Sequence, residues 1–148
     1  MIRIAVQSEA IDVAAEFAAI AGAGVGGIAT FTGVVRADDG VSALELEHYP
    51  GATEAALRRL AEEAAERWSL VAATITHRVG VMQPGDLVVF VGTAAVHRAA
   101  ALDSCAYLID RLKTDAPFWK RETRGARADW VEPRDSDSLA AARWSRES

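Results

Sequence analysis

The sequence contains very little cysteine and no long hydrophobic run. Cys105 is the only cysteine among 148 residues, which excludes an internal disulfide and favours a reducing compartment. It lies in the apolar run "ALDSCAYLI" and is expected to be a buried core thiol, not a nucleophile. Nowhere do about 18 uncharged apolar residues follow one another, and the N-terminus lacks the pattern of a signal peptide. We therefore expect a cytoplasmic protein that does not cross a membrane.

Metal-binding and nucleophile motifs are also missing. The three histidines show no H-x-x-x-H spacing, and no G-x-S-x-G motif is present. We therefore recognise no metal site, and we assign His48 and His77 structural or surface roles. The glycines of "GAGVGG", residues 22–27, fit neither dinucleotide nor P-loop spacing, so they predict a connection between elements more than a phosphate site.

The sequence also lacks an excess of positive charge. The formal net charge is -5 and the sequence pI is near 5.2, which argues against a protein that coats nucleic acid or an anionic membrane. Residues 111–127 nevertheless carry six basic side chains against two acidic ones. This asymmetry predicts a small basic pocket on an acidic body.

The size and the hydrophobic periodicity predict one α+β domain over residues 1–148, with a polar C-terminal tail at 136–148. With 51% hydrophobic residues the chain can bury a core without disulfides. Helical and alternating patterns are distinguished by their periods of 3.6 and 2. The expected helices are 10–21, 51–70 and 98–114, and the expected strands are 3–7, 27–36, 42–49, 72–82, 87–96, 118–123 and 128–132. We expect strands 72–82 and 87–96 to pair as a hairpin, and the tail to form a short exposed helix.

In "RLKTDAPFWKRET" two lysines flank a segment that contains the bulky apolar residues Phe118 and Trp119. Because Pro117 disfavours helical geometry in the residue before it, Lys113 is expected in the last turn of a helix and Lys120 in an extended segment. A lysine at a helix end also complements the helix dipole, and a strand lysine can simply be solvated. In an extended segment Phe118 shares a face with Lys120, so its apolar ring could lower the pKa of a lysine. Phe118 and Trp119 are also candidates for the wall of a pocket.

Cations at two other junctions add to this pattern. His97 and Arg98 fall where a buried strand meets the start of a helix, and an anion there would resolve the conflict between Arg98 and the helix dipole. The alternative is that Arg98 is solvated and His97 bonds locally. Arg36 ends the strand "FTGVVR", where it is either a surface charge or part of an anion site.

Five segments, in this order, resemble the large, catalytic subunit family of molybdopterin synthase. They are "FTGVVR", "LEHYPGATE", "HRVGVMQPGD", "VGTAAVHRAAA" and "LKTDAPFWKRE". The likeness runs from about Gly27 to Trp144, and "APFWKRE" after "LKT" is its most specific part.

The resemblance implies an α+β hammerhead-type domain with an antiparallel or mixed sheet and flanking helices. It also implies a cytoplasmic sulfurtransferase of molybdenum cofactor biosynthesis, which converts cyclic pyranopterin monophosphate to molybdopterin. The two sulfurs would come from the thiocarboxylated C-terminus of a small ubiquitin-like subunit ending in Gly-Gly. The large subunit would form a homodimer within a heterotetramer, with no nucleic acid or membrane as partner.

Carried over onto this chain, the resemblance places the catalytic role on two lysines and substrate binding on six other residues. The lysines are Lys113, expected to be the main acid/base, and Lys120, expected to bind substrate and the partner's tail. The substrate-binding residues are Arg36, His97, Arg98, Arg121, Glu122 and Arg134, with Arg134 expected to reach a neighbouring subunit's site. Val34 stands where many relatives carry lysine. An alternative remains: a non-catalytic module that binds a phosphorylated small molecule or a ubiquitin-like tail.

Overall fold

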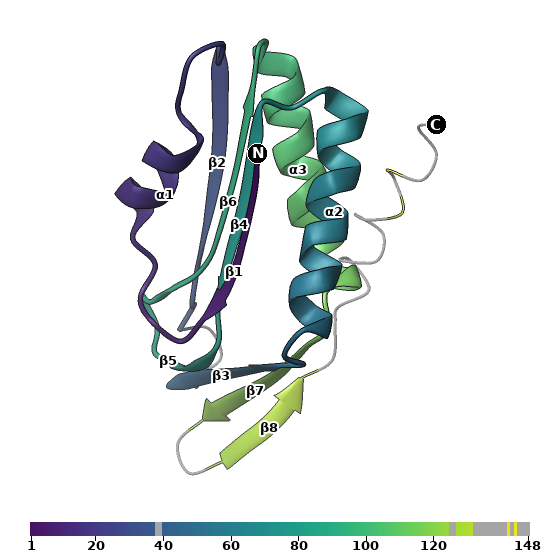
Figure 1. Cartoon of the computed structure of the whole chain (residues 1–148). Coiled ribbons are helices and arrows are strands. Elements are labelled where there is room, and N and C mark those ends of the chain that lie inside the picture. The colour runs from purple at the N-terminus through teal and green to yellow at the C-terminus, as the bar shows by residue number, and fades with distance from the viewer. Residues whose placement is uncertain (38–39, 125–126, 132–141, 143, 145–148) are drawn as a thin grey trace.

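The computed structural model describes residues 1–37, 40–124, 127–131, 142 and 144, and these form helices and strands in the order expected for an α+β fold (Figure 1). The helices are α1 (Val13–Ile20), α2 (Ala52–Trp68) and α3 (Arg98–Asp115). The strands are β1 (Ile2–Gln7), β2 (Gly27–Val34), β3 (Ala43–His48), β4 (Ala72–Arg78), β5 (Gly80–Met82), β6 (Leu87–Ala95), β7 (Phe118–Arg124) and β8 (Arg127–Val131).

The larger sheet has the strand order β1-β4-β6-β2 and is mixed. β1 runs parallel to β4, whereas β6 is antiparallel to both β4 and β2. α2 and α3 cover one face of this sheet and α1 lies on the other (Figure 1). The predicted pairing of the strands on either side of "QPGD" is confirmed, since β4 and β6 align from Ala72 with Ala94 to His77 with Val89.

The smaller sheet, with the order β5-β3-β7-β8, is antiparallel and lies at one end of the molecule (Figure 1). The prediction of one unbroken strand over residues 72–82 is wrong. Gly80 has φ of 90°, a value that L side chains rarely adopt, and the chain turns there from β4 into β5. β5 then pairs with β3 in the smaller sheet, so this one segment joins the two sheets.

The main core fills the space between the larger sheet and the helix pair α2 and α3. Leu57, Ile75 and Leu108 are fully buried in it, and α2 supplies its apolar face at the spacing expected from the sequence. Phe118, the first residue of β7, packs against the same core. This contact attaches the smaller sheet to the end of α3.

The side chain of Trp144 packs against residues of α2 and α3. The indole Nε1 of Trp144 donates to Asp110 Oδ2 at 2.7 Å, and its ring makes edge contacts with Trp68 and Tyr107 at centroid distances of 5.9 and 5.7 Å. The predicted helix at 136–148 otherwise falls outside the described residues.

Candidate functional site

Lys113 lies where the sequence places it, in the last turn of α3. The helix ends at Ala116, whose extended backbone precedes Pro117, as expected for the residue before a proline. Lys113 is exposed and lines a small apolar hollow with Phe31 of β2 and Ile109 of α3. Phe31 was not predicted as a site residue. The sequence feature that could have pointed to it is an aromatic side chain on a strand that ends near the candidate residue Arg36.

Lys120 projects from β7 on the same face as Phe118 and Glu122. Residues 118, 120 and 122 are half-buried, whereas Trp119 and Arg121 between them are exposed, which is the alternation of a strand. Lys120 Nζ lies 3.4 Å from Glu122 Oε1. This ion pair restrains the position of the Lys120 ammonium.

Glu122 has a second cationic partner, because Arg124 Nη2 donates to its Oε2 at 2.7 Å. Arg121 points to the opposite side of β7, pairs with Glu45 at 3.7 Å and lies over the ring of Trp130 at 5.8 Å. The structure therefore groups Lys120 with Glu122 but separates both from Arg121.

Arg36 follows the end of β2 and is exposed at the same end of the larger sheet as Lys113. Val34 pairs with Leu87 at the start of β6, and the hollow beside Lys113 includes Val89 two residues further on. Val34 is itself exposed, beside an irregularity in the strand register. This end of the molecule thus presents Lys113 beside an apolar hollow, with Arg36 following the end of β2 and the apolar Val34 exposed on that strand.

Phe118 and Trp119 have different environments. Phe118 stacks on His77 with ring centroids 4.0 Å apart, so it supports the strand that carries Lys120. Trp119 lies on the other face of β7 and makes edge contacts with Tyr49 and Trp130.

His97 and Arg98 occupy the opposite end of α3. His97 is the N-cap residue but makes no side-chain capping bond, and the first turn of the helix contains no acidic residue. Both side chains are exposed and line an open hollow of about 470 Å³ with Gly26 and Val96. Uncapped helix N-terminal amides beside an arginine and an imidazole form an environment that suits an anion.

Gly26 and Gly27, which end the 22–27 loop, serve close packing at this hollow. A Cβ on Gly26 would lie 2.0 Å from the carbonyl oxygen of Val96, and one on Gly27 would lie 3.2 Å from Arg98 Cα. Only glycine fits at Gly26 without moving the backbone. The loop is therefore a tightly packed connection that also borders the hollow.

Within one chain, the structure does not bring all predicted site residues together. Arg98 and Lys113 are fifteen residues apart along one helix, which at about 1.5 Å per residue places their backbones roughly 22 Å apart. Lys113, Lys120, Glu122 and Arg36 lie toward one end of α3, and His97 and Arg98 toward the other. The predicted residue Arg134 lies outside the described residues.

Cys105 is buried, and desolvation raises the pKa of its thiol to about 11, so it is a core residue and not a thiolate nucleophile.

Within the ranges that the structure describes, no three His, Cys, Asp or Glu side chains are grouped to hold a metal ion. The described helices include none long and apolar enough to cross a membrane.

Among the residues that the structure describes, His77 has a clearly lowered pKa. Burial is the main cause and the nearby His48 adds to it, while a hydrogen bond to the Arg78 carbonyl opposes it; the result is a pKa of about 4. The folded protein therefore holds His77 neutral and stacked on Phe118, whereas the unfolded chain protonates it near its ordinary pKa of 6.5.

This difference predicts a loss of stability in mild acid. Because the unfolded state binds the extra proton, the free energy of unfolding falls as the pH drops from 6.5 to 4, by roughly 3 kcal/mol for this group. Denaturant unfolding across this range measures it. The variant His77→Gln should lose this part of the pH dependence and the exposed-site control His97→Gln should keep it; equal pH profiles for His77→Gln and the wild type would contradict the assignment.

The fold and the geometry define a class: an α+β protein with two lysines near the C-terminal end of its longest described helix and, at the other end, an uncapped helix N-terminus beside a histidine and an arginine. A sequence model of the MoaE protein family matches residues 6–115. The molybdopterin synthase catalytic subunit of Rhizobium meliloti is 47% identical over 150 residues, covering 98% of this chain and 97% of the relative.

Solved structures agree with the sequence comparison. The molybdopterin biosynthesis MoaE protein of Burkholderia ambifaria has a TM-score of 0.86 and 46% identity, covering 98% of this chain and 99% of that one. Molybdopterin synthase of Staphylococcus aureus has a TM-score of 0.81 and 29% identity, covering 88% and 96%. The chain belongs to the MoaE family. The predicted α+β fold and the prediction of a molybdopterin synthase catalytic subunit in molybdenum cofactor biosynthesis are confirmed.

Proposed function

We propose that this chain converts cyclic pyranopterin monophosphate to molybdopterin, using two sulfurs delivered by the thiocarboxylated C-terminus of a small ubiquitin-like subunit. The observation that carries the proposal is that Lys113 and Phe31 line one hollow at the end of α3, where the chain continues into β7, the strand that carries Lys120. An apolar floor with surrounding cations suits a flat pterin that bears a phosphate.

The chemistry divides between the two lysines. The thiocarboxylate sulfur attacks a pterin carbon, so that a carbon–sulfur bond forms while a carbon–oxygen bond breaks, and the tail is then joined to the pterin as a thioester. Water cleaves the acyl carbon–sulfur bond of this thioester, which leaves the sulfur on the product and a carboxylate on the partner's tail. Lys113, exposed beside the hollow, acts as the acid/base for the leaving oxygen and the attacking water. Lys120, held beside Glu122, stabilises the developing oxyanion and binds the tail.

A second copy of the chain would complete the site. In a symmetric dimer whose α3 helices run antiparallel, His97 and Arg98 of one copy approach Lys113 of the other. Exposed apolar side chains on α3 and β2 favour such a contact, since Leu102 is 61% exposed, Val34 48% and Phe31 38%. His97 and Arg98 would then hold the substrate phosphate through charge-assisted hydrogen bonds, and Arg134 would act in the neighbouring copy's site.

Reconstitution tests the proposed function directly. The purified chain is mixed with a thiocarboxylated small subunit and cyclic pyranopterin monophosphate, and a dithiolene product is expected. A control with the unmodified carboxylate form of the small subunit should give none. Binding of both ligands without any product would instead support a non-catalytic binding module.

A further inference from the structure

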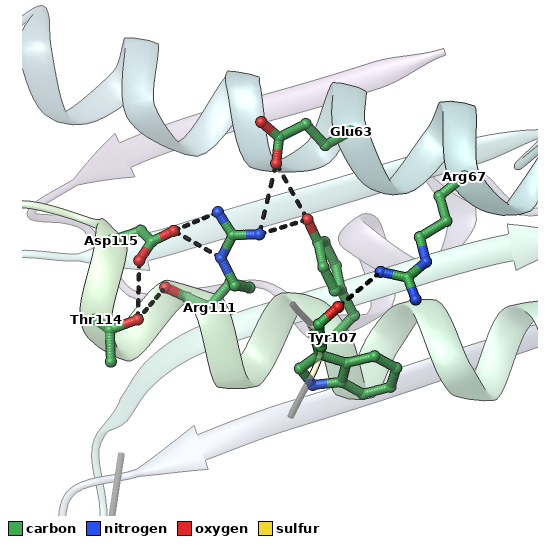
Figure 2. Close-up of polar contacts among 7 residues, drawn as sticks. Glu63, Arg67, Tyr107, Arg111, Thr114 and Asp115 are labelled. Carbon is green, nitrogen blue, oxygen red and sulfur yellow. Dashed lines mark hydrogen bonds and ion pairs between the residues drawn. The ribbon is translucent and has the colours of Figure 1, made fainter. Parts of the chain in front are cut away.

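A network of polar contacts joins the last turns of α3 to α2 (Figure 2). At its centre is Arg111. Its Nε and Nη2 lie 2.6 and 2.5 Å from Asp115 Oδ2, and its Nη1 donates to the Tyr107 hydroxyl at 2.7 Å. Tyr107 donates in turn to Glu63 Oε2 of α2 at 3.1 Å, and that carboxylate lies 3.6 Å from Arg111 Nη1. One guanidinium thus connects two turns of α3 and the neighbouring helix.

The end of α3 needs such a restraint. The last carbonyls of a helix have no intrahelical partners, and this helix ends at Ala116 with extended backbone instead of a left-handed glycine cap. Thr114 Oγ1 lies 3.3 Å from the Arg111 carbonyl and 2.9 Å from Asp115 Oδ1, so it ties the same turn to the network. Lys113 lies within this turn.

Helix electrostatics alone do not account for Asp115. A carboxylate in the last turn opposes the helix dipole, and an acid four residues after an arginine is the less favourable order for a helical pair. The two contacts with Arg111 compensate for the unfavourable position of the Asp115 carboxylate. Arg111 is itself half-buried and forms ion pairs with both Asp115 and Glu63. The network therefore restrains the position of the last turn of α3 more than it stabilises the helix.

The network and the hollow lie on opposite sides of α3. Residues 111 and 113 are separated by about 200° around a helix. Arg111 accordingly contacts α2, while Lys113 lines the hollow with Phe31 of β2. Arg111 does not line the hollow, so any effect of Arg111 on Lys113 runs through the helix backbone.

We propose that Arg111, with Asp115, Tyr107 and Glu63, is a positioning network that fixes the last turn of α3 and so aims the Lys113 ammonium at the reacting atoms. This inference rests on the proposed function, in which Lys113 is the acid/base. Misplacement of a catalytic group by about 1 Å can cost up to two orders of magnitude in rate. Loosening the network should therefore slow the chemical step without weakening the binding of substrate.

Arg111→Gln tests the network in the full chain, with the exposed Arg59→Gln on α2 as the matched control. With thiocarboxylated small subunit and cyclic pyranopterin monophosphate, the single-turnover rate constant should fall on the order of tenfold in Arg111→Gln, while the dissociation constants of both ligands stay the same. Amide hydrogen exchange over residues 112–116 should quicken by about tenfold, with no change in the first turn of α3. Arg111→Lys keeps the charge but not the planar fork, and should recover part of the rate.

An unchanged rate constant in folded Arg111→Gln, or a rate loss matched by weaker ligand binding, would overturn the proposal. If that variant does not fold, Tyr107→Phe decides: it removes only the hydroxyl that links Arg111 to Glu63 and should slow the rate by about threefold. The wild type run in parallel separates the two hypotheses. No product from the wild type refutes the proposed function, whereas wild-type product with an unaffected Arg111→Gln refutes only the positioning role.

Discussion

Replacing Lys113 with alanine is expected to lower the rate of dithiolene formation by a factor of about 10²–10⁴, the usual contribution of a general acid or base. The side chain is exposed beside the hollow, so its removal leaves the core packing unchanged. The loss of a cation at the helix C-terminus costs only about 0.3–1 kcal/mol of stability. The measurement is the single-turnover rate with thiocarboxylated small subunit, alongside the melting temperature.

The second lysine is the natural comparison, because Lys113 and Lys120 are the only lysines in the chain. Lys120→Ala should chiefly weaken binding of the partner's tail, with a smaller change in the rate at saturation, because the ammonium beside Glu122 is assigned to binding. Full activity of Lys113→Ala would remove that residue from the mechanism. The reverse pattern, in which Lys120→Ala abolishes the rate and Lys113→Ala weakens binding, would exchange the two roles.

Mixing two inactive variants is expected to restore activity. Lys113→Ala and Arg98→Ala are each expected to be nearly inactive, because each lacks one half of a shared site. In a mixed dimer, one site then combines both substitutions and the other combines the intact Lys113 of one copy with the intact Arg98 of the other. If half of the dimers are mixed, the activity should recover to about a quarter of the wild-type value.

This complementation separates a shared site from a site within one chain. The separation of roughly 22 Å between Arg98 and Lys113 along α3 makes a site within one chain difficult to build. The matched control mixes Lys113→Ala with Lys120→Ala, two residues assigned to the same copy's site, and should show only the activity that the Lys120→Ala chains have on their own. No recovery in the first mixture, with exchange of chains verified by mass spectrometry, would contradict the shared site.

The sequence predicted the elements well because their local signals agree with the fold. The spacing of Leu57 and Leu60 predicted α2, and both residues are buried in the main core. Pro117 predicted the end of α3, and the helix does end just before it. The alternation in "FWKRET" placed Phe118 and Lys120 on one face of a strand, as β7 shows.

The sequence failed where the outcome depends on tertiary structure. The period of residues 72–82 is that of a single strand, and nothing local shows that Gly80 turns the chain from one sheet into the other. Phe31 was missed because an aromatic residue on a strand is more often part of the core.

The most direct test of the account is the sulfur balance of a single turnover by the wild-type chain. With an excess of thiocarboxylated small subunit over cyclic pyranopterin monophosphate, mass spectrometry counts the thiocarboxylates converted to carboxylates, and the dithiolene is quantified in the same sample. The account predicts two tails converted for each molybdopterin formed, and none when the pterin is omitted. Tails that bind but remain thiocarboxylates in the presence of the pterin would contradict it.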